Sequence, residues 1–259
     1  MGQPVNEPIM GFAPGSPERE ALQNEMDRQL GEVIEIPCVV NGELIFTGNT
    51  VTQVVPHDHG HILANVHLAG REEIEAACRA AVDAQESWID LGLEGRCAIF
   101  ERCADLLAGD WRMRVNASTM LNQSKTAFQA EIDSACELID FWRFNCHYAR
   151  GFHDDLQPLV SPAGVENSTE IRPLEGFVLS ITPFNFTSIA ANLPSAPAIV
   201  GCTSVWKPSR NSYHSNYVLM QLMMDAGLPP GVINFLPGSG AEITGAALSN
   251  PDFAGLHFT

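Results

Sequence analysis

The residues best suited to chemistry in this chain lie at the end of a short apolar run at positions 176–186. The run predicts a buried strand that ends at Thr182-Pro183, because proline has no N–H with which to continue a strand ladder. The apolar stretch at 189–200 is long enough for a helix. A strand, a tight turn and a helix together place the turn at the carboxyl end of a parallel sheet, where ligands bind.

Asn185 lies in that turn, where it offers an uncharged amide donor among apolar neighbours. A buried amide needs a hydrogen-bond partner. At such a turn the partner is either nearby backbone or an oxygen atom of a ligand. Backbone is the commoner partner of an isolated asparagine, so the rest of the chain has to support a ligand.

Lys207 ends a second expected strand, residues 203–208, and would lie next to the first turn if the two strands are neighbours. A cation there suits a ribose hydroxyl or a phosphate, and the alternative is a surface lysine that caps a strand. The Gly238-x-Gly240 loop lacks the GxGxxG spacing of a dinucleotide fingerprint. Its glycines would still let a planar adenine or a ribose approach the backbone closely.

Glu137 shares one face of an expected helix with Asp133 and Asp140. An acidic stripe of this kind is typical of a solvated face. Only a position beside a pocket would make Glu137 a ligand for the ammonium group of a substrate.

Three histidines alternate at His57, His59 and His61, a spacing that puts side chains on one face of a strand. A glycine interrupts the run, and no cysteine or carboxylate stands at a suitable spacing to complete a metal site. We interpret the cluster as a polar turn and predict no metal.

The composition argues against two classes of partner. The net charge is −17, from 14 basic and 31 acidic side chains, and no Lys/Arg cluster forms the basic face that nucleic acid needs. No apolar run reaches the roughly 18 residues that suggest a membrane span, and the N-terminus lacks the basic and apolar regions of a signal peptide. Seven cysteines without a CxxC pair indicate reduced thiols, so we expect a cytoplasmic location, or the mitochondrial matrix in a eukaryote although no transit peptide is evident.

The periodicity of the chain divides it into four parts. Residues 1–33 are expected to wrap loosely over the surface as an arm, and residues 34–154 to form a hairpin around Asn41-Gly42 and then helices at 74–91, 99–106, 111–121 and 126–150. Residues 155–175 predict a second hairpin, which would pack on another subunit because a two-stranded ribbon cannot bury its faces alone.

Strands and helices alternate in the fourth part, residues 176–259. Further strands are expected at 232–236 and 255–259, and helices at 213–226 and 241–248, with Gly227 ending the first of these helices. This alternation predicts an α/β fold with a parallel, doubly wound, Rossmann-like sheet.

These motifs together resemble the aldehyde dehydrogenase family. Members carry a Pro-aromatic-Asn-Phe turn, a strand that ends in Lys-Pro-Ser and a Pro-Gly-x-Gly loop, which stand here at 183–186, 207–209 and 237–240. Most members have tryptophan where this chain has Phe184. The phenylalanine, with LEGF at 174–177, NQSKT at 122–126 and ELIDFWRFN at 137–145, is similar to a branch that oxidises L-glutamate γ-semialdehyde, the open form of 1-pyrroline-5-carboxylate, in proline degradation. The resemblance runs from residue 36 to residue 259.

The resemblance implies roles for single residues. Asn185 would be the oxyanion donor, and Glu137 and Phe186 would face the aldehyde substrate. NAD would be the cofactor. The residues of this chain that match the family's cofactor contacts are Thr182, Pro183, Phe184, Lys207, Ser209 and Gly240. Arg210 stands where the family has an acid that binds a ribose hydroxyl. A guanidinium there would admit NADP as well, and the alternative is that Arg210 simply points to solvent. Residues 155–175 match the family's oligomerisation hairpin, so a homodimer or higher homo-oligomer is expected.

The resemblance also implies what the chain lacks. In the family, a Gly-Ser turn, the general-base glutamate and the nucleophilic cysteine all follow the Phe-Thr at which this sequence stops. Cys202 directly precedes a strand and is expected to be a buried structural thiol, not a substitute nucleophile. We therefore expect an amino-terminal portion without the catalytic domain, inactive on its own. The alternative is a non-catalytic fragment that binds a nucleotide or pairs subunits.

Overall fold

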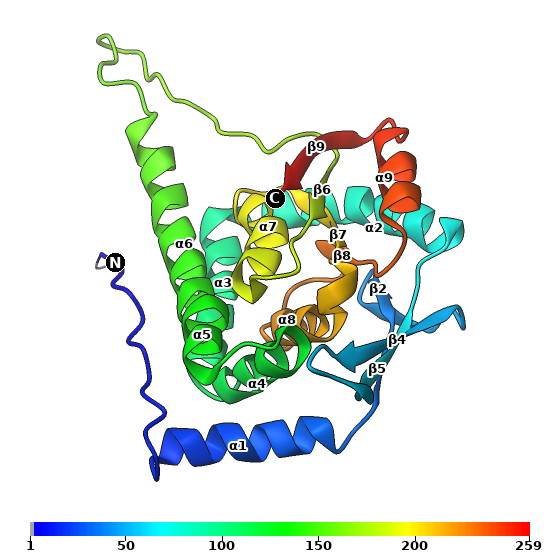
Figure 1. Ribbon diagram of the computed structural model, residues 1–259. Helices are drawn as coiled ribbons and strands as arrows, with labels where there is room; N and C mark the ends of the chain where they lie inside the picture. The colour runs from blue at the N-terminus through cyan, green and yellow to red at the C-terminus, as the bar shows by residue number, and fades with distance from the viewer. Residues whose placement is uncertain (1–2) are drawn as a thin grey trace.

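The computed structural model describes residues 3–259 and has a six-stranded sheet at its centre (Figure 1). The strand order is β3-β2-β8-β7-β6-β9, with β2 Cys38–Val40, β3 Glu43–Ile45, β6 Phe177–Ile181, β7 Thr203–Lys207, β8 Ile233–Phe235 and β9 Phe253–Phe258. Strands β6 to β9 are parallel, whereas β2 runs antiparallel to both β8 and β3. The predicted parallel sheet and the predicted hairpin are thus confirmed, and the hairpin extends the edge of the same sheet.

The direction of winding changes at β6. The chain goes from β6 to β7 and then to β8 on one side, and it returns to place β9 on the other side of β6. The carboxyl ends of β6 and β9 therefore flank the switch point of a doubly wound sheet, which is where such folds bind ligands.

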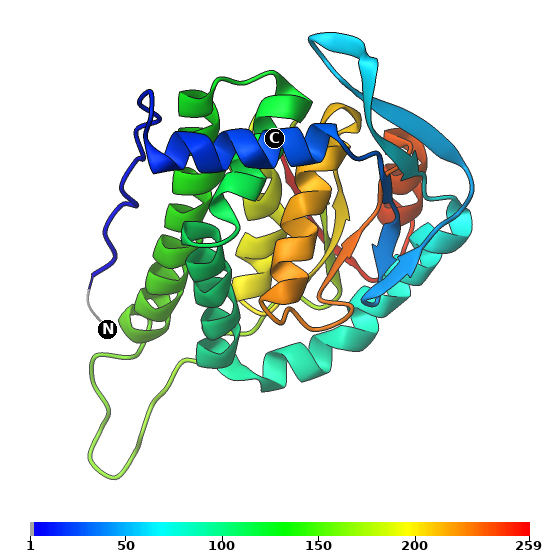
Figure 2. The same cartoon turned by 90° about the horizontal axis from the view of Figure 1, so that it is seen from below.

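Helices cover both faces of this sheet (Figures 1 and 2). Successive residues of β7 point to opposite faces: Val205 joins one buried cluster and Trp206 joins the other. The Val205 face packs against α2 (Arg71–Asp90) and α9 (Gly240–Leu248). The Trp206 face is covered by the helices α7 Thr187–Ile199 and α8 Tyr213–Asp225, with α3 Gly92–Ala108 and α6 Glu137–Asp155 also contributing to its core.

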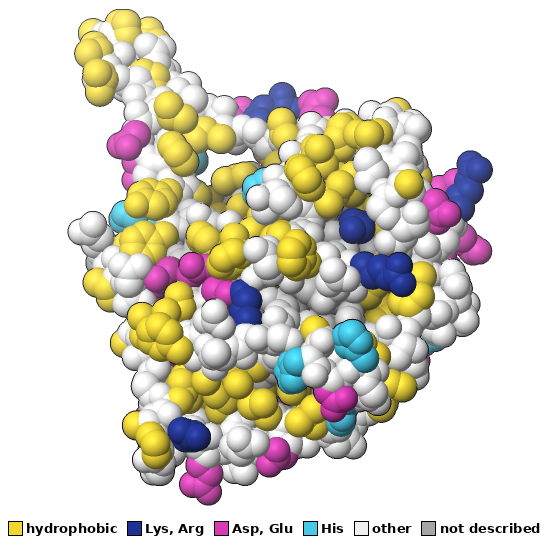
Figure 3. Space-filling model, viewed as in Figure 1, with side chains coloured by type: hydrophobic (Ala, Val, Ile, Leu, Met, Phe, Trp, Pro, Cys, Tyr) yellow, Lys and Arg dark blue, Asp and Glu magenta, His cyan; other side chains and the backbone are white. Residues whose placement is uncertain are grey.

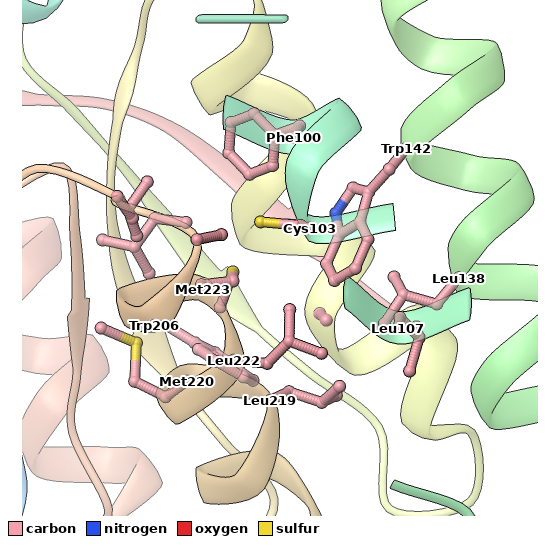
Figure 4. Close-up of a cluster of buried hydrophobic side chains, with 14 of the residues drawn as sticks. Phe100, Cys103, Leu107, Leu138, Trp142, Trp206, Leu219, Met220, Leu222 and Met223 are labelled. Atoms are coloured by element: carbon pink, nitrogen blue, oxygen red, sulfur yellow. The ribbon is translucent and has the colours of Figure 1, made fainter. Parts of the chain in front are cut away.

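The larger core fixes α6 against α7. Trp142, Phe100 and Leu138 are fully buried in it, and Figure 4 shows them facing side chains of α8. Burial of a side chain of this size stabilises the fold by about 1.5–3 kcal/mol. The indole N–H of Trp142 also donates to the hydroxyl of Ser195 at 3.0 Å, which joins α6 to α7.

The expectation of a loose N-terminal arm is wrong for residues 17–30. They form α1 (Pro17–Leu30), whose N-cap Ser16 accepts from the backbone N–H of Arg19. Helix α1 packs along α4 (Arg112–Gln123), and the Gln29 side chain donates to the backbone carbonyl of Arg114 at 3.0 Å. The arm is therefore part of the packed structure.

A second sheet has the strand order β1-β5-β4, with β1 Ile34–Ile36, β4 Thr50–Val55 and β5 Asp58–His67. Only His57 of the histidine run lies in the turn between β4 and β5, whereas His59 and His61 lie in β5, so the expectation of a polar turn is wrong for these two. His57 shares a hydrogen bond with the Ser124 hydroxyl at 2.8 Å, and His61 with the Leu30 carbonyl at 2.9 Å. Residues 3–259 hold no group of three or more side chains arranged as metal ligands.

The helix expected at 126–150 is interrupted. Helix α5 (Ala127–Ala130) leads into a π-helix, Glu131–Cys136, and α6 begins at Glu137. The Ser134 hydroxyl donates to the Ala130 carbonyl at 2.5 Å within this widened turn. Single π-helical turns occur often at functional sites.

Residues 156–176 leave the body of the molecule and return, but they contain no strand (Figure 1). The path is that of the expected hairpin, yet the two arms are joined through the side chain of Gln157, which bonds the backbone of Thr169 in both directions at 3.0 and 3.1 Å. An isolated two-stranded ribbon is marginal in water, which explains why the ladder does not form here. In the described part of the chain, no helix is both long enough and apolar enough to span a bilayer.

Candidate active site

The turn after β6 is held against the end of β7. The backbone N–H of Thr182 donates to the Lys207 carbonyl at 3.2 Å, and the Thr182 hydroxyl accepts from the indole N–H of Trp206 at 3.0 Å. The Pro183 carbonyl accepts from the Ser212 hydroxyl at 3.5 Å. Strands β6 and β7 are neighbours, so Lys207 lies beside the turn as the sequence suggested.

Asn185 is exposed, which corrects the expectation of a buried amide. It lines a cavity of about 400 Å³ together with Phe184, Gln123 and Lys125, and the Phe184 ring is 57% exposed. Within residues 3–259 Asn185 is bonded by Lys125 through its backbone carbonyl, and its side chain makes no hydrogen bond. Its amide is therefore free to bind a ligand.

Lys207 and Gly240 lie together at the carboxyl edge of the sheet. A Cβ atom added to Gly240 would lie 3.8 Å from Cε of Lys207 and 3.9 Å from its Nζ. The ammonium forms no hydrogen bond or ion pair with the residues that the structure describes. Partial burial lowers the pKa of Lys207, because the charged form loses water. An oxygen-rich ligand would supply the missing partner.

Ser209 and Arg210 follow in the same loop. Ser209 is the N-cap of a short 3-10 helix, Arg210–Ser212, and its carbonyl accepts from the backbone N–H of Ser212 at 3.1 Å. Arg210 is exposed and has no acidic partner within the described residues. The loop therefore offers a free guanidinium close to Lys207 in sequence.

The sequence suggested that the acidic residues of α6 and the π-helix form a solvated stripe. The structure shows instead that each of them has a partner. Glu137 accepts from the Ser188 hydroxyl of α7 at 2.8 Å, and Asp133 forms an ion pair with Lys125. Asp140 accepts from the Asn6 side chain and from the Glu7 backbone, both at 2.7 Å. Each carboxylate thus joins two segments of the chain.

Phe186 and Glu137 both lie near Lys125. The Lys125 ammonium is 4.5 Å from the centroid of the Phe186 ring. Burial lowers the pKa of Lys125, and the charge of Glu137 partly opposes that shift. The two residues expected to face a substrate are therefore brought together around a cation that the sequence analysis did not single out.

All seven cysteines are buried as free thiols. Burial raises the pKa of Cys202, as expected for a structural thiol. The thiols of Cys38 and Cys103 are held neutral by the same effect. Cys97 differs, because a hydrogen bond from Cys146 lowers its pKa, but it is buried like the others. None of the seven has the exposed setting that a nucleophile needs.

Residues 46–259 match the aldehyde dehydrogenase family. The chain belongs to that family. Over 257 residues it is 47% identical to a protein from Agaricus bisporus named delta-1-pyrroline-5-carboxylate dehydrogenase, with 98% of this chain and 46% of that protein covered. It is 42% identical over 255 residues to the human mitochondrial protein of that name, with 98% and 45% covered.

The same likeness extends to solved structures. A Mycobacterium tuberculosis delta-pyrroline-5-carboxylate dehydrogenase, crystallised with NAD and cobalamin, superposes with a TM-score of 0.96 at 47% identity, covering 100% of this chain and 47% of that one. A Thermus 1-pyrroline-5-carboxylate dehydrogenase with bound NAD gives a TM-score of 0.90 at 26% identity, covering 99% and 49%. The chain spans about half the length of the curated relatives it matches.

Two residues of this candidate site, Trp206 and Lys125, were not predicted from the sequence. Trp206 fixes the Thr182 hydroxyl, and Lys125 contacts both Asp133 and the Asn185 backbone. One signal for Lys125 was present in the composition: the chain has only two lysines, Lys125 and Lys207, among 14 basic residues. Both of them adjoin the turn that carries Asn185.

Proposed function

We propose that this chain is the cofactor-binding portion of an NAD-dependent dehydrogenase that oxidises L-glutamate γ-semialdehyde to L-glutamate. One observation carries the proposal: the unpaired ammonium of Lys207 adjoins Gly240 at the carboxyl edge of a doubly wound sheet. The likeness to delta-1-pyrroline-5-carboxylate dehydrogenases over nearly the whole chain, including two structures with NAD bound, supports this choice of cofactor and substrate.

The residues present fit such a cofactor. The Lys207 ammonium would donate to hydroxyls of the adenosine ribose, and the missing side chain at Gly240 would leave room for the sugar and the base. Thr182, Pro183 and Phe184 would line the path toward the nicotinamide, and Ser209 and Arg210 would border the ribose. When bound, NAD would accept a hydride from the substrate.

Asn185 would act on the oxygen of the aldehyde. Addition of a thiolate to the carbonyl carbon turns that oxygen into an anion, which an amide N–H can stabilise by a hydrogen bond. The amide is free and exposed beside a cavity, as this role requires. The thiolate comes from none of the seven cysteines of this chain, because all of them are buried.

Glu137 and Phe186 would hold the rest of the substrate. A carboxylate in the first turn of α6 suits the ammonium group of glutamate semialdehyde, and the Phe186 ring suits its methylene chain. Glu137 already accepts one hydrogen bond from Ser188, which leaves its other oxygen for the substrate.

Self-association is also part of the proposal. The segment 155–175 projects from the body with apolar side chains in water, among them Leu159, 99% exposed, and Val160, 76% exposed (Figure 3). Such side chains gain by packing on another subunit. We therefore propose a homodimer or a higher homo-oligomer. The free, buried thiols fit a reducing compartment such as the cytoplasm or the mitochondrial matrix.

The test of the proposal is binding of NAD to the 259-residue chain. Replacing Lys207 by methionine keeps the apolar stem and removes the donor. Hydrogen bonds from a charged group are worth about 1.5–3 kcal/mol, so the Kd for NAD should rise roughly 10- to 100-fold. Isothermal titration calorimetry measures both variants at fixed salt.

Arg102→Gln is the matched control, because Arg102 is exposed on α3 and forms no ion pair within the described residues. It removes the same charge away from the site, and its Kd should stay within about two-fold of the native value. Failure of the native chain to bind NAD would contradict the proposal. Equal binding by the Lys207→Met variant would show that the cofactor lies elsewhere.

Arg210 offers a prediction about the choice between NAD and NADP. A guanidinium can pair with a ribose 2′-phosphate, whereas a carboxylate accepts a hydrogen bond from the 2′-hydroxyl and repels the phosphate. Arg210→Glu is therefore expected to weaken NADP binding relative to NAD by about 10-fold. Calorimetry with both dinucleotides checks this, and an unchanged ratio of the two Kd values would remove Arg210 from the site.

A further inference from the structure

Lys125 joins three elements beside the Asn185 turn. It follows Ser124, whose left-handed conformation (φ 56°, ψ 36°) ends α4. The Lys125 ammonium contacts the Asp133 carboxylate of the π-helix and the backbone carbonyl of Asn185, and it stands 4.5 Å from the centroid of the Phe186 ring. One side chain thus bonds a charge, a peptide oxygen and an aromatic face.

These contacts are largely shielded from water. The Lys125 side chain is 15% exposed and that of Asp133 is 9% exposed. Oδ1 of Asp133 is buried and has no hydrogen-bond partner in the described chain. Contacts between charges and dipoles gain strength away from water. Without the ammonium, the Asp133 carboxylate would lose its cation and the Asn185 carbonyl would lose this donor.

No hydrogen bond from the described residues fixes the direction of the Asn185 side-chain amide. It makes no hydrogen bond within residues 3–259, and the residue is exposed. The direction of the amide therefore depends on the backbone of the turn. Lys125 is the side chain that bonds the Asn185 backbone through its carbonyl oxygen.

We propose that Lys125 is a positioning residue, which holds the Asn185 peptide by its carbonyl oxygen and so aims the Asn185 amide at the reacting oxygen. The role in the reaction rests on the proposed function. The hold on the backbone does not, and it can be measured separately. Because misplacement of a catalytic group lowers the rate of the chemical step, the inference predicts a loss in kcat and little change in cofactor binding.

Amide hydrogen exchange in the 259-residue chain tests the hold directly. Lys125→Met is expected to speed exchange of the first hydrogen-bonded backbone amides after the turn, residues 190 and 191, by about 10-fold or more, because the Ala190 N–H donates to the Phe186 carbonyl at 3.0 Å and local opening of the turn becomes easier. Lys125→Arg keeps a donor and a charge and should restore most of the protection. Arg102→Gln, which removes an exposed charge on α3, should leave exchange in these residues unchanged.

The two-lysine composition allows a check that needs no change at Lys125. Reductive ¹³C-methylation of the amines keeps the charge and labels only Lys125, Lys207 and the N-terminus. The methyl signal of Lys125 should be shifted by the Phe186 ring and should lose that shift in Phe186→Leu. Two lysine signals at ordinary positions would contradict the contact, whether or not Lys125→Met folds.

The kinetic arm uses a chimera that joins residues 1–259 to the carboxyl-terminal half of the Mycobacterium tuberculosis relative. Lys125→Met should lower kcat by about 10- to 100-fold with the KM for NAD within about two-fold, and Lys125→Arg should recover activity. Unchanged exchange in the chain overturns the inference and leaves the NAD proposal standing. Faster exchange in a chain that does not bind NAD overturns the proposed function and leaves the positioning role of Lys125 intact.

Discussion

Arg112→Ala is expected to destabilise the chain by about 3–5 kcal/mol, because it leaves a buried carboxylate without its cation. Arg112 is 2% exposed and Glu131 is 0% exposed, and the guanidinium donates to both carboxylate oxygens of Glu131. The same guanidinium bonds Glu7 at 2.6 Å and the Pro8 carbonyl at 2.7 Å. Its loss would therefore release the N-terminal segment as well as the π-helix. Urea unfolding followed by tryptophan fluorescence measures the change.

The pH dependence of this effect has a definite sign. Burial by itself would raise the pKa of Glu131, but hydrogen bonds from Arg112, from the Met10 N–H and from Asn116 bring it below its ordinary value of 4.5. In the native chain, the stability that Glu131 contributes is therefore present above that pH and is lost as the pH falls through the folded pKa. In the variant, only the Met10 and Asn116 hydrogen bonds oppose the effect of burial, so the pKa of Glu131 is higher than in the native chain. The difference in stability should be larger at pH 7 than at pH 4.5.

Arg143→Ala is the control for the loss of a guanidinium. Arg143 also bonds Glu7, at 2.7 Å, but its side chain is 29% exposed. A partly exposed ion pair is worth about 0–1 kcal/mol, so this variant should differ little from the native chain. Equal losses in the two variants would show that burial of the Arg112 and Glu131 charges does not govern their contribution.

The strands and helices that position the site could be predicted because their apolar residues repeat regularly. Residues 203–207 form a strand that stops at Pro208, and Gly227, with φ +92°, ends the helical segment before it as the sequence indicated. The meeting of Lys207 with the Thr182 turn follows from topology, since the carboxyl ends of neighbouring parallel strands share one edge. No side-chain detail was needed for that inference.

Helix α1 could not be predicted in this way. Its apolar stripe is narrow: Leu22, Met26 and Leu30 follow one another at intervals of four residues, but only Leu22 is fully buried, and Met26 and Leu30 are partly buried. Its N-terminus does carry a signal, since Ser16 precedes a proline at the first helical position. A capping signal beside so narrow an apolar face is weak evidence, because most helical stability comes from packing.

The π-helix and its partners depend on contacts between distant parts of the chain. Glu131 meets Arg112 from 19 residues away, and Lys125 meets the Asn185 carbonyl from 60 residues away. A local pattern cannot reveal such pairs. The acidic stripe was misinterpreted for the same reason, since each of its carboxylates bonds a donor on another segment.

Asn185→Ala is expected to lower kcat/KM for glutamate semialdehyde by about 100-fold or more, an effect typical of losing one oxyanion donor. The chimera with the carboxyl-terminal half of the Mycobacterium tuberculosis relative provides the assay. Because the Asn185 side chain is exposed and makes no hydrogen bond within residues 3–259, its removal should cost almost no stability. Activity and folding are thus separated in a single variant.

The matched control for this variant is Asn145→Ala. The Asn145 amide on α6 donates to the Asn192 side chain at 2.9 Å. Asn145→Ala therefore removes an asparagine whose side chain has a structural partner. That variant should keep kcat/KM within about three-fold while losing roughly 1 kcal/mol of stability. For Asn185→Ala we expect the reverse, with the rate of thiohemiacetal formation in single-turnover experiments falling and the Kd for NAD unchanged. If the loss appeared only as weaker NAD binding, Asn185 would be a cofactor contact, and the developing oxyanion would have to be stabilised by another donor.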